Sequence, residues 1–223
     1  MTVRFTVAAL RPLVRHTGFG LAVLAACGWG CSSGPSRIKP PSIDADGAAA
    51  EAMEMYDQDA DGALAGAELD ASPGLKSAQA SFDANQDGKI QQDEIQRRIE
   101  AWQATGIGVM SVSFLFTMDG QPLPGAQVTF EPEPFLGDEI KTAVGETLMY
   151  GSVSPSIPKE ERPSADMPAG FQVGLYRVRV SKKVDGKETI PARYNAETTL
   201  GQQVSPDDPA IANQKARFDL TCK

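Results

Sequence analysis

Oxygen-bearing side chains recur at a fixed spacing in two short stretches of the sequence, residues 57–68 and 83–94. Each stretch has an Asp or Asn at its first, third and fifth positions, a glycine at its sixth and a glutamate at its twelfth. Carboxylate, amide and backbone oxygens are the ligands that Ca²⁺ prefers, and the ion takes six to eight of them. The two stretches therefore predict two Ca²⁺ sites.

The position within each stretch indicates what each residue would contribute. Gly62 and Gly88 would allow the sharp turn at the sixth position, and the seventh residue would offer only its backbone carbonyl. A glutamate that gives two oxygens favours Ca²⁺ over the smaller Mg²⁺. Because the first stretch has four carboxylates and the second three, we expect tighter binding in the first. The predicted ligands are Asp57, Asp59, Asp61, Ala63 and Glu68 in the first stretch, and Asp83, Asn85, Asp87, Lys89 and Glu94 in the second.

Both stretches match the EF-hand pattern D-x-[DN]-x-[DN]-G-x5-E, in which helices flank each loop. Apolar residues at helical spacing in 49–56, 75–82 and 95–102 predict those helices. Leu64 and Ile90, at the eighth position of each loop, would pair the loops through a short antiparallel contact. The alternative is an acidic helical pair whose loops no longer bind metal.

The charge distribution and the histidine content argue against two classes of function, nucleic-acid binding and catalysis. Residues 44–100 hold 14 acidic and 4 basic residues, a net charge of −10, which favours cations and argues against a nucleic-acid partner. The only histidine is His16, which lies in a segment that we expect to be removed. Without histidine the chain lacks Ser–His and Cys–His catalysis and imidazole-ligated metals, so we expect no enzyme.

The N-terminus has the features of an export signal. Arg4, Arg11 and Arg15 precede an apolar run at 18–26, which is too short to span a bilayer. The sequence before Cys27 resembles a bacterial lipobox, which implies a signal peptide over 1–26, acylation of Cys27, and anchoring in the outer membrane or cell envelope. An ordinary signal peptide with an incidental cysteine is the alternative. The Pro- and Ser-rich residues up to 44 predict a flexible linker over 27–44.

Two further cysteines, Cys31 and Cys222, would remain after acylation of Cys27. In an oxidising compartment they could form a disulfide that ties the linker to the last strand, and two free thiols are the alternative.

After residue 105 the apolar pattern changes from helical to alternating, and Gly and Pro turns separate the alternating runs. This pattern predicts an antiparallel β-sandwich over 105–223, behind a helical domain over 45–104, and hence an α+β fold. Residues 119–130 and 174–178 resemble carboxypeptidase-regulatory-like (transthyretin-like) domains. Residues 190–200 and 218–220 resemble the version of this domain in planctomycete envelope lipoproteins, and the order of signal, lipobox, EF-hand pair and sandwich adds to that resemblance. The resemblance implies a prealbumin-like module of about seven strands without an active site. The alternating runs lie at residues 110–116, 126–130, 176–180 and 217–220.

These features together predict a Ca²⁺-binding envelope lipoprotein with a structural or adhesion-type role, in which two Ca²⁺ ions stabilise the helical pair. The alternative is a Ca²⁺-dependent module that presents the sandwich to an envelope protein or glycan. The two differ in whether removal of Ca²⁺ changes partner binding or only the melting temperature.

Overall fold

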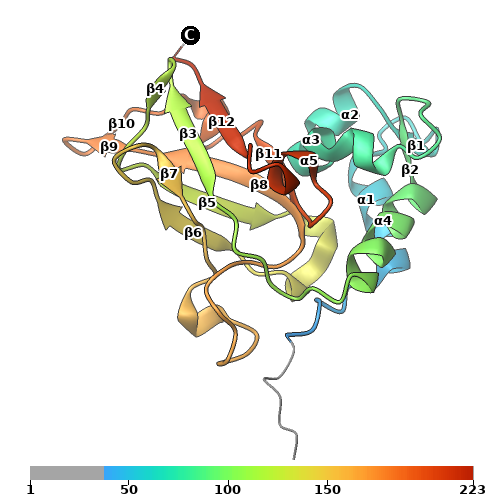
Figure 1. The fold of residues 1–223 in the computed structure, drawn as a ribbon. Coiled ribbons are helices and arrows are strands. Elements are labelled where there is room, and N and C mark those ends of the chain that lie inside the picture. Colours follow the sequence, from blue (N-terminus) through green and yellow to red (C-terminus); the bar gives the residue numbers. More distant parts are fainter. Residues whose placement is uncertain (1–37, 223) are drawn as a thin grey trace, which may run out of the picture. The chain divides into compact units, whose positions relative to one another are not determined.

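The computed structural model describes residues 38–222, in which four helices come first and several small β-sheets follow (Figure 1). The predicted α+β class is therefore confirmed. The predicted signal peptide over 1–26, the acylated Cys27 and the thiol of Cys31 lie outside the described residues. Within 38–222, no helix combines the length and the apolar character needed to cross a membrane.

The helices form where the apolar spacing predicts them, and each buries the residues that recur at three and four positions. Ala49 and Ala52 of the first helix, and Ile95 and Ile99 of the last, are fully buried. Pro73 begins the third helix, where its missing N–H costs no hydrogen bond, and Ser72 is the N-cap residue. The helices are α1 (Ala45–Tyr56), α2 (Ala67–Asp70), α3 (Pro73–Phe82) and α4 (Gln92–Ala104).

Two short strands connect the loops that lie between these helices. β1 (Ala63–Leu64) pairs antiparallel with β2 (Ile90–Gln91), and Leu64 lies opposite Ile90. The predicted pairing of the two eighth-position residues is therefore confirmed. Both side chains are fully buried, so the pair closes the core beneath the loops.

The remaining strands form two four-stranded sheets and a hairpin. One sheet has the order β11-β8-β5-β6 and the other β12-β3-β4, with β7 also paired to β3. The strands of the first sheet are β5 (Gln127–Pro132), β6 (Ala143–Glu146), β8 (Gly174–Ser181) and β11 (Gly201–Val204). Those of the second are β3 (Phe114–Met118), β4 (Gln121–Pro122), β7 (Ser152–Val153) and β12 (Arg217–Leu220), and the hairpin contains β9 (Lys183–Val184) and β10 (Lys187–Glu188). Short helical segments lie between them: η1 (Pro134–Glu139), η2 (Lys159–Glu161), η3 (Ala192–Tyr194) and α5 (Pro209–Ala212).

One strand pair departs from the antiparallel arrangement that the sequence predicts. β12 runs parallel to β3, with Phe218 opposite Phe116. The chain reaches β12 through α5 after it leaves β11, and this connection lets the last strand enter in the direction of β3. Alternation of apolar residues gives the same signal for both directions, because it reports burial of one face and not strand polarity.

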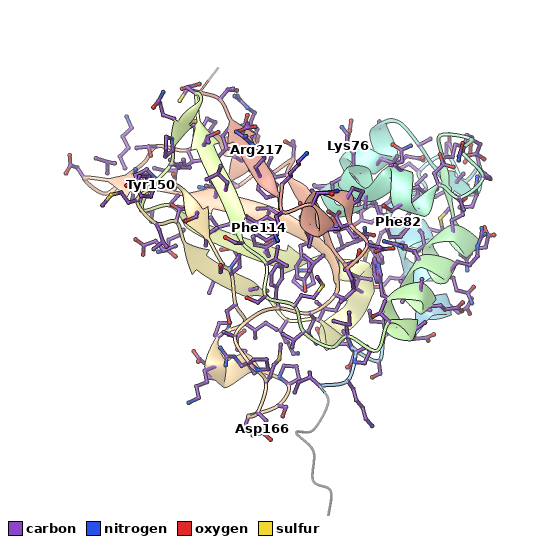
Figure 2. All side chains as sticks on the ribbon, in the orientation of Figure 1. Lys76, Phe82, Phe114, Tyr150, Asp166 and Arg217 are labelled. Carbon is purple, nitrogen blue, oxygen red and sulfur yellow. The ribbon has the colours of Figure 1, made fainter. Side chains whose placement is uncertain are left out.

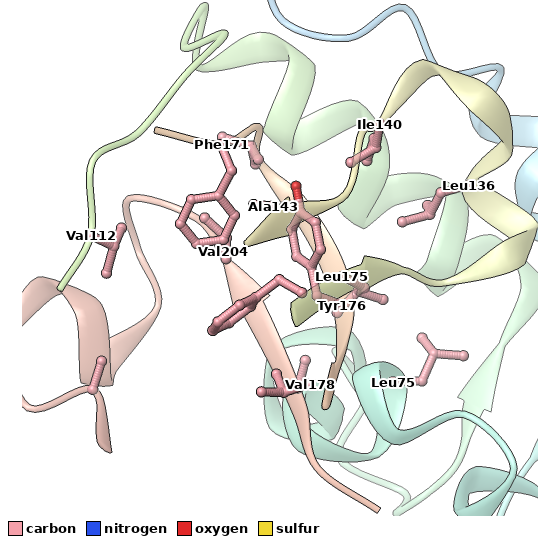
Figure 3. Packing of buried hydrophobic residues seen from close by; sticks show 14 of the residues in the cluster. Leu75, Val112, Leu136, Ile140, Ala143, Phe171, Leu175, Tyr176, Val178 and Val204 are labelled. Atoms are coloured by element: carbon pink, nitrogen blue, oxygen red, sulfur yellow. The ribbon is translucent and has the colours of Figure 1, made fainter. Parts of the chain in front are cut away.

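Aromatic side chains fill the space between the two four-stranded sheets. The ring of Phe114 on β3 lies 4.9 Å from that of Phe130 on β5, and the ring of Phe116 stacks at 4.8 Å on Phe218. Phe171, just before β8, lies 5.4 Å from the ring of Tyr176 (Figure 3). Rings in edge or offset contact stabilise a core beyond their buried area, so this cluster holds the two sheets together.

The helices pack directly on the first sheet. A Cβ atom added to Gly201 at the start of β11 would lie 1.8 Å from the carbonyl oxygen of Pro73 in α3. Only glycine permits this approach of strand backbone to helix backbone. The described residues 38–222 accordingly belong to one compact unit.

The described end of the predicted linker, residues 38–44, is packed against the helices. Ile43 is buried, and the amide of Gln103 in α4 donates to its carbonyl oxygen at 2.7 Å. Asp44 caps α1 by accepting from the N–H of Gly47. A Pro- and Ser-rich composition predicts flexibility, but in this segment the single buried isoleucine and the helix cap order the chain.

Candidate metal centre

The two predicted loops, the first loop (57–68) and the second loop (83–94), share a common set of internal hydrogen bonds. The aspartate at position 1 accepts from the glycine N–H at position 6, at 3.0 Å for Asp57 and 2.8 Å for Asp83. The side chain at position 3 accepts from the N–H of position 5, and that at position 5 from position 7. These bonds turn the oxygens of positions 1, 3 and 5 toward the inside of each loop.

The glutamate at position 12 closes each loop across its full length. Glu68 accepts from the N–H of Gln58 at 2.9 Å and from that of Ala65 at 3.0 Å. Glu94 makes the equivalent bonds with Ala84 and Gln91, at 2.9 and 3.1 Å. The bonds from Ala65 and Gln58 lower the pKa of the Glu68 carboxyl, so this group is ionised at neutral pH.

The backbone of each loop reaches the left-handed region at two equivalent positions. Ala60 and Gln86, both at position 4, have φ values of 57° and 62°. Gly62 and Gly88, both at position 6, have values of 85° and 82°. A left-handed conformation is unfavourable for a residue with a Cβ atom, so its presence at the same place in both loops shows that one turn geometry is built twice.

The first loop brings three carboxylates together. Asp57, Asp59 and Asp61 each have an oxygen that lies within 4.8 Å of the others. The Oδ1 atom of Asp57 is buried and has no hydrogen-bond partner among the described residues. A buried carboxylate oxygen without a partner is costly unless a cation compensates it. The residues of the first loop therefore fit a Ca²⁺ ion, with Glu68 and the Ala63 carbonyl as the remaining predicted protein ligands.

The second loop differs in the partners of the same side chains. Both oxygens of Asp83 accept hydrogen bonds, from the N–H groups of Asp87 and Gly88. The Oδ2 atom of Asp87 accepts from the side-chain amides of Asn85 and Gln91, at 2.9 and 2.8 Å. Side-chain amides thus compensate part of the charge that a cation would otherwise neutralise. This difference agrees in direction with the expectation that the first loop binds more tightly.

A contact between the loops was not predicted from the sequence, which assigned only the backbone carbonyl of Lys89 to the site. The ammonium group of Lys89 lies 2.7 Å from Oδ2 of Asp61, a predicted ligand of the other loop. The hydrogen bond from Lys89 lowers the pKa of Asp61, and the same bond raises the pKa of Lys89. The pairing of β1 with β2 brings Lys89 and Asp61 together. In the sequence, only the antiparallel pairing expected at Leu64 and Ile90 indicated that the two loops would meet.

A buried ionic network joins the first loop to the sheet. The carboxylate of Glu133 is fully buried and accepts from Arg177 Nε at 2.9 Å and from the N–H of Gly74 at 2.7 Å. Arg177 also donates to the hydroxyl of Tyr56 and to the carbonyl of Ala71, at 2.8 and 3.1 Å. Tyr56 directly precedes the first predicted ligand, Asp57, so the sheet holds the loop at its entry. Alternation in β5 and β8 gave no indication of this network.

A second polar link joins α4 to the sheet. Arg98 donates to both carboxylate oxygens of Asp207, at 2.8 and 2.9 Å, and its Nε donates to the side chain of Gln203 on β11. Since α4 begins near Glu94, the second loop is held at its exit by this link.

Far from the loops, Cys222 is exposed with a free thiol in the part of the chain that the structure describes.

Figure 2 places Lys76 and Phe82 of α3 on the side of the helices, where Phe82 immediately precedes the second loop.

No model of a known protein family matches the chain, and a search of curated proteins gives no match. The function must therefore be inferred from the geometry of the loops and from the contacts that hold them.

Proposed function

We propose that the protein binds two Ca²⁺ ions in an EF-hand pair and that the ions stabilise a structural or adhesion-type lipoprotein of the bacterial envelope. The observation that carries the proposal is the buried, unpaired Oδ1 atom of Asp57 within the carboxylate group of the first loop. The repetition of the same hydrogen bonds in the second loop supports a second ion. The basic and apolar N-terminal sequence with its lipobox-like cysteine supports the export and the anchor.

The proposed fold family is an EF-hand pair packed on a prealbumin-like module. The short antiparallel contact of Leu64 with Ile90 between two flanked loops supports the pair. Aromatic contacts between two four-stranded sheets support the sandwich, although the parallel β12–β3 pair departs from the antiparallel arrangement. The likeness to carboxypeptidase-regulatory-like domains of planctomycete lipoproteins stays part of this proposal.

A structural role for the ions follows from the way in which the loops are held. A sensor exposes an apolar groove when its helices open on binding Ca²⁺. Here α3 begins against the backbone of Gly201, and the Glu133–Arg177 pair fixes Tyr56 at the entry to the first loop. Opening of the helices would break these buried contacts. Each ion would instead stabilise the packed state, by about 2.7 kcal/mol where free Ca²⁺ is 100 times the dissociation constant.

Isothermal titration of the protein with CaCl₂ tests the proposal. The parent should bind two equivalents, and Glu68→Gln and Glu94→Gln should each lose one, because either change removes a carboxylate oxygen at position 12. Glu51→Gln is a matched control, since Glu51 is an exposed glutamate of α1 outside both loops. Absence of binding heat in the parent, together with a melting temperature that does not change with Ca²⁺, would overturn the proposal.

A further inference from the structure

Three consecutive large apolar side chains are exposed at one turn of the structure. Leu148, Met149 and Tyr150 have exposed fractions of 67%, 75% and 75%. They lie in the turn between β6 and β7, and Figure 2 shows Tyr150 on the side of the sheets away from Phe82. Exposed apolar groups that gather in one place indicate a contact surface, whereas single ones are ordinary. We name residues 148–150 the apolar tip.

The backbone holds the apolar tip in a fixed conformation. The N–H of Leu148 donates to the carbonyl of Ser152, and that of Gly151 donates to the carbonyl of Leu148, both at 2.8 Å. The carbonyl of Gly151 accepts from the N–H of Phe116 on β3, also at 2.8 Å. Gly151 has φ = 77°, and an added Cβ atom would lie 2.2 Å from the carbonyl oxygen of Phe116. The three side chains are therefore displayed by an ordered turn that is bonded to the sheet.

A lysine-bearing hairpin emerges from the same end of the first sheet. Glu146, the last residue of β6, and Ser181, the last of β8, both lie opposite Gln127 of β5. Strand spacing places these two strand ends about 10 Å apart. Beyond them the chain continues into the apolar tip on one side and into the β9–β10 hairpin on the other.

The hairpin combines cationic and apolar groups. Lys183 and Lys187 are exposed, and neither forms an ion pair with another described residue. Val184, which follows Lys183 in β9, lies opposite Lys187 and has an exposed fraction of 50%. Glu188 of β10 lies opposite Lys183 and accepts from the Ser181 hydroxyl and from backbone N–H groups, and Asp185 is exposed at the turn of the hairpin.

We propose that the apolar tip and the β9–β10 hairpin form a surface that contacts an anionic lipid bilayer. Lys183 and Lys187, which form no ion pair with another described residue, are complementary in charge to an anionic lipid surface. This cationic hairpin stands out because the chain as a whole has a net charge of −8. Lysines near an anionic surface gain electrostatic attraction, and a tyrosine beside aliphatic side chains suits the region between headgroups and acyl chains. Leucine and methionine side chains would enter the bilayer interface while the backbone stays hydrogen-bonded.

A fluorophore placed on the apolar tip tests the contact. The full chain carries Cys27→Ser, Cys31→Ser, Cys222→Ser and Met149→Cys, and the new cysteine is labelled with an environment-sensitive dye. Vesicles of phosphatidylcholine with phosphatidylglycerol should shift its emission to the blue, and bromine atoms on the acyl chains should quench it. Because the readout is local to residue 149, attachment of the chain by its N-terminal apolar run does not by itself give this signal.

Met55→Cys in the same background, labelled with the same dye, is the matched control, because Met55 is an exposed methionine of α1. Only the dye at 149 should respond, and Lys183→Glu with Lys187→Glu should raise the lipid concentration at half-maximal response at least tenfold. The response should persist in EDTA, so failure of the proposed Ca²⁺ function would not affect it. Three results would each overturn the proposal: an unchanged spectrum at 149, an equal change at 55, or an unaltered response in the lysine variant. The surface would then be assigned to a protein partner.

Discussion

The ammonium group of Lys89 in the second loop lies 2.7 Å from Oδ2 of Asp61 in the first. Both side chains are about two-fifths exposed, at 43% and 40%. A cation is thus already present beside one of the three carboxylates that converge in the first loop. The lysine couples the loops electrostatically, and it opposes the binding of a divalent cation at Asp61.

Replacement of Lys89 by methionine should strengthen Ca²⁺ binding in the first loop. The change removes the competing positive charge but keeps the backbone carbonyl at position 7. The pair is exposed and screened by solvent, so the affinity should rise only a few-fold, and less at high salt. Calcium titration of Lys89→Met in the Glu94→Gln background measures the first loop alone. Lys76→Met, which removes an exposed lysine paired with Asp70 outside the loops, is the control, and an equal rise in both variants would contradict the prediction.

Replacement of Arg177 by methionine should destabilise the protein strongly, because it leaves the buried carboxylate of Glu133 without its charge partner. Removing one partner of a buried pair costs about 3 kcal/mol of unfolding free energy, which denaturant unfolding can measure. Arg179→Met is the matched control on the same strand, since its partner Glu131 is 36% exposed and the pair should be worth less than about 1 kcal/mol. Similar losses in the two variants would contradict the prediction.

Replacement of Gly201 by alanine should separate β11 from α3. The added methyl group would lie 1.8 Å from the carbonyl oxygen of Pro73, and both atoms belong to or adjoin backbone that cannot rotate away. Overpacking of this kind costs about 1–3 kcal/mol or more. Guanidinium unfolding measures the loss, and amide exchange in α3 should accelerate. A stability equal to that of the parent would show that helix and strand can shift without cost.

The ion pair between Arg98 and Asp207 should contribute stability that is lost in acid. The hydrogen bond from Arg98 lowers the pKa of Asp207 to about 2, against burial that acts in the opposite direction. A carboxyl whose pKa is lower in the folded state stabilises the fold above its unfolded pKa of about 3.9, and this contribution disappears as the pH falls toward 2. The difference in unfolding free energy between parent and Asp207→Asn should therefore be constant from pH 7 to about 5 and shrink between about pH 4 and 2. A difference that is independent of pH across that range would contradict the assignment.

The sequence by itself determined the features that depend on neighbours along the chain. The ligand spacing of residues 57–68 and 83–94 predicted two loops, and both have the same turn and share a set of backbone-to-carboxylate hydrogen bonds, because all the participating groups lie within one short stretch. The helices α1, α3 and α4 and the strands β3, β5, β8 and β12 were predicted from apolar periodicity for the same reason. Periodicity reports only which face is buried, so the parallel direction of β12 was not predictable from it.

Only the tertiary structure decided which distant groups meet. Arg177 was an ordinary polar position of an alternating strand and Glu133 lay outside the predicted runs, yet the fold buries Glu133 fully and pairs it with Arg177. The Lys89–Asp61 contact depends on the pairing of β1 with β2, and the common exit of the apolar tip and the lysine hairpin depends on the order β8-β5-β6. These relationships join residues far apart in the sequence, and no local pattern encodes them, because they arise when separate elements bury their apolar faces against each other.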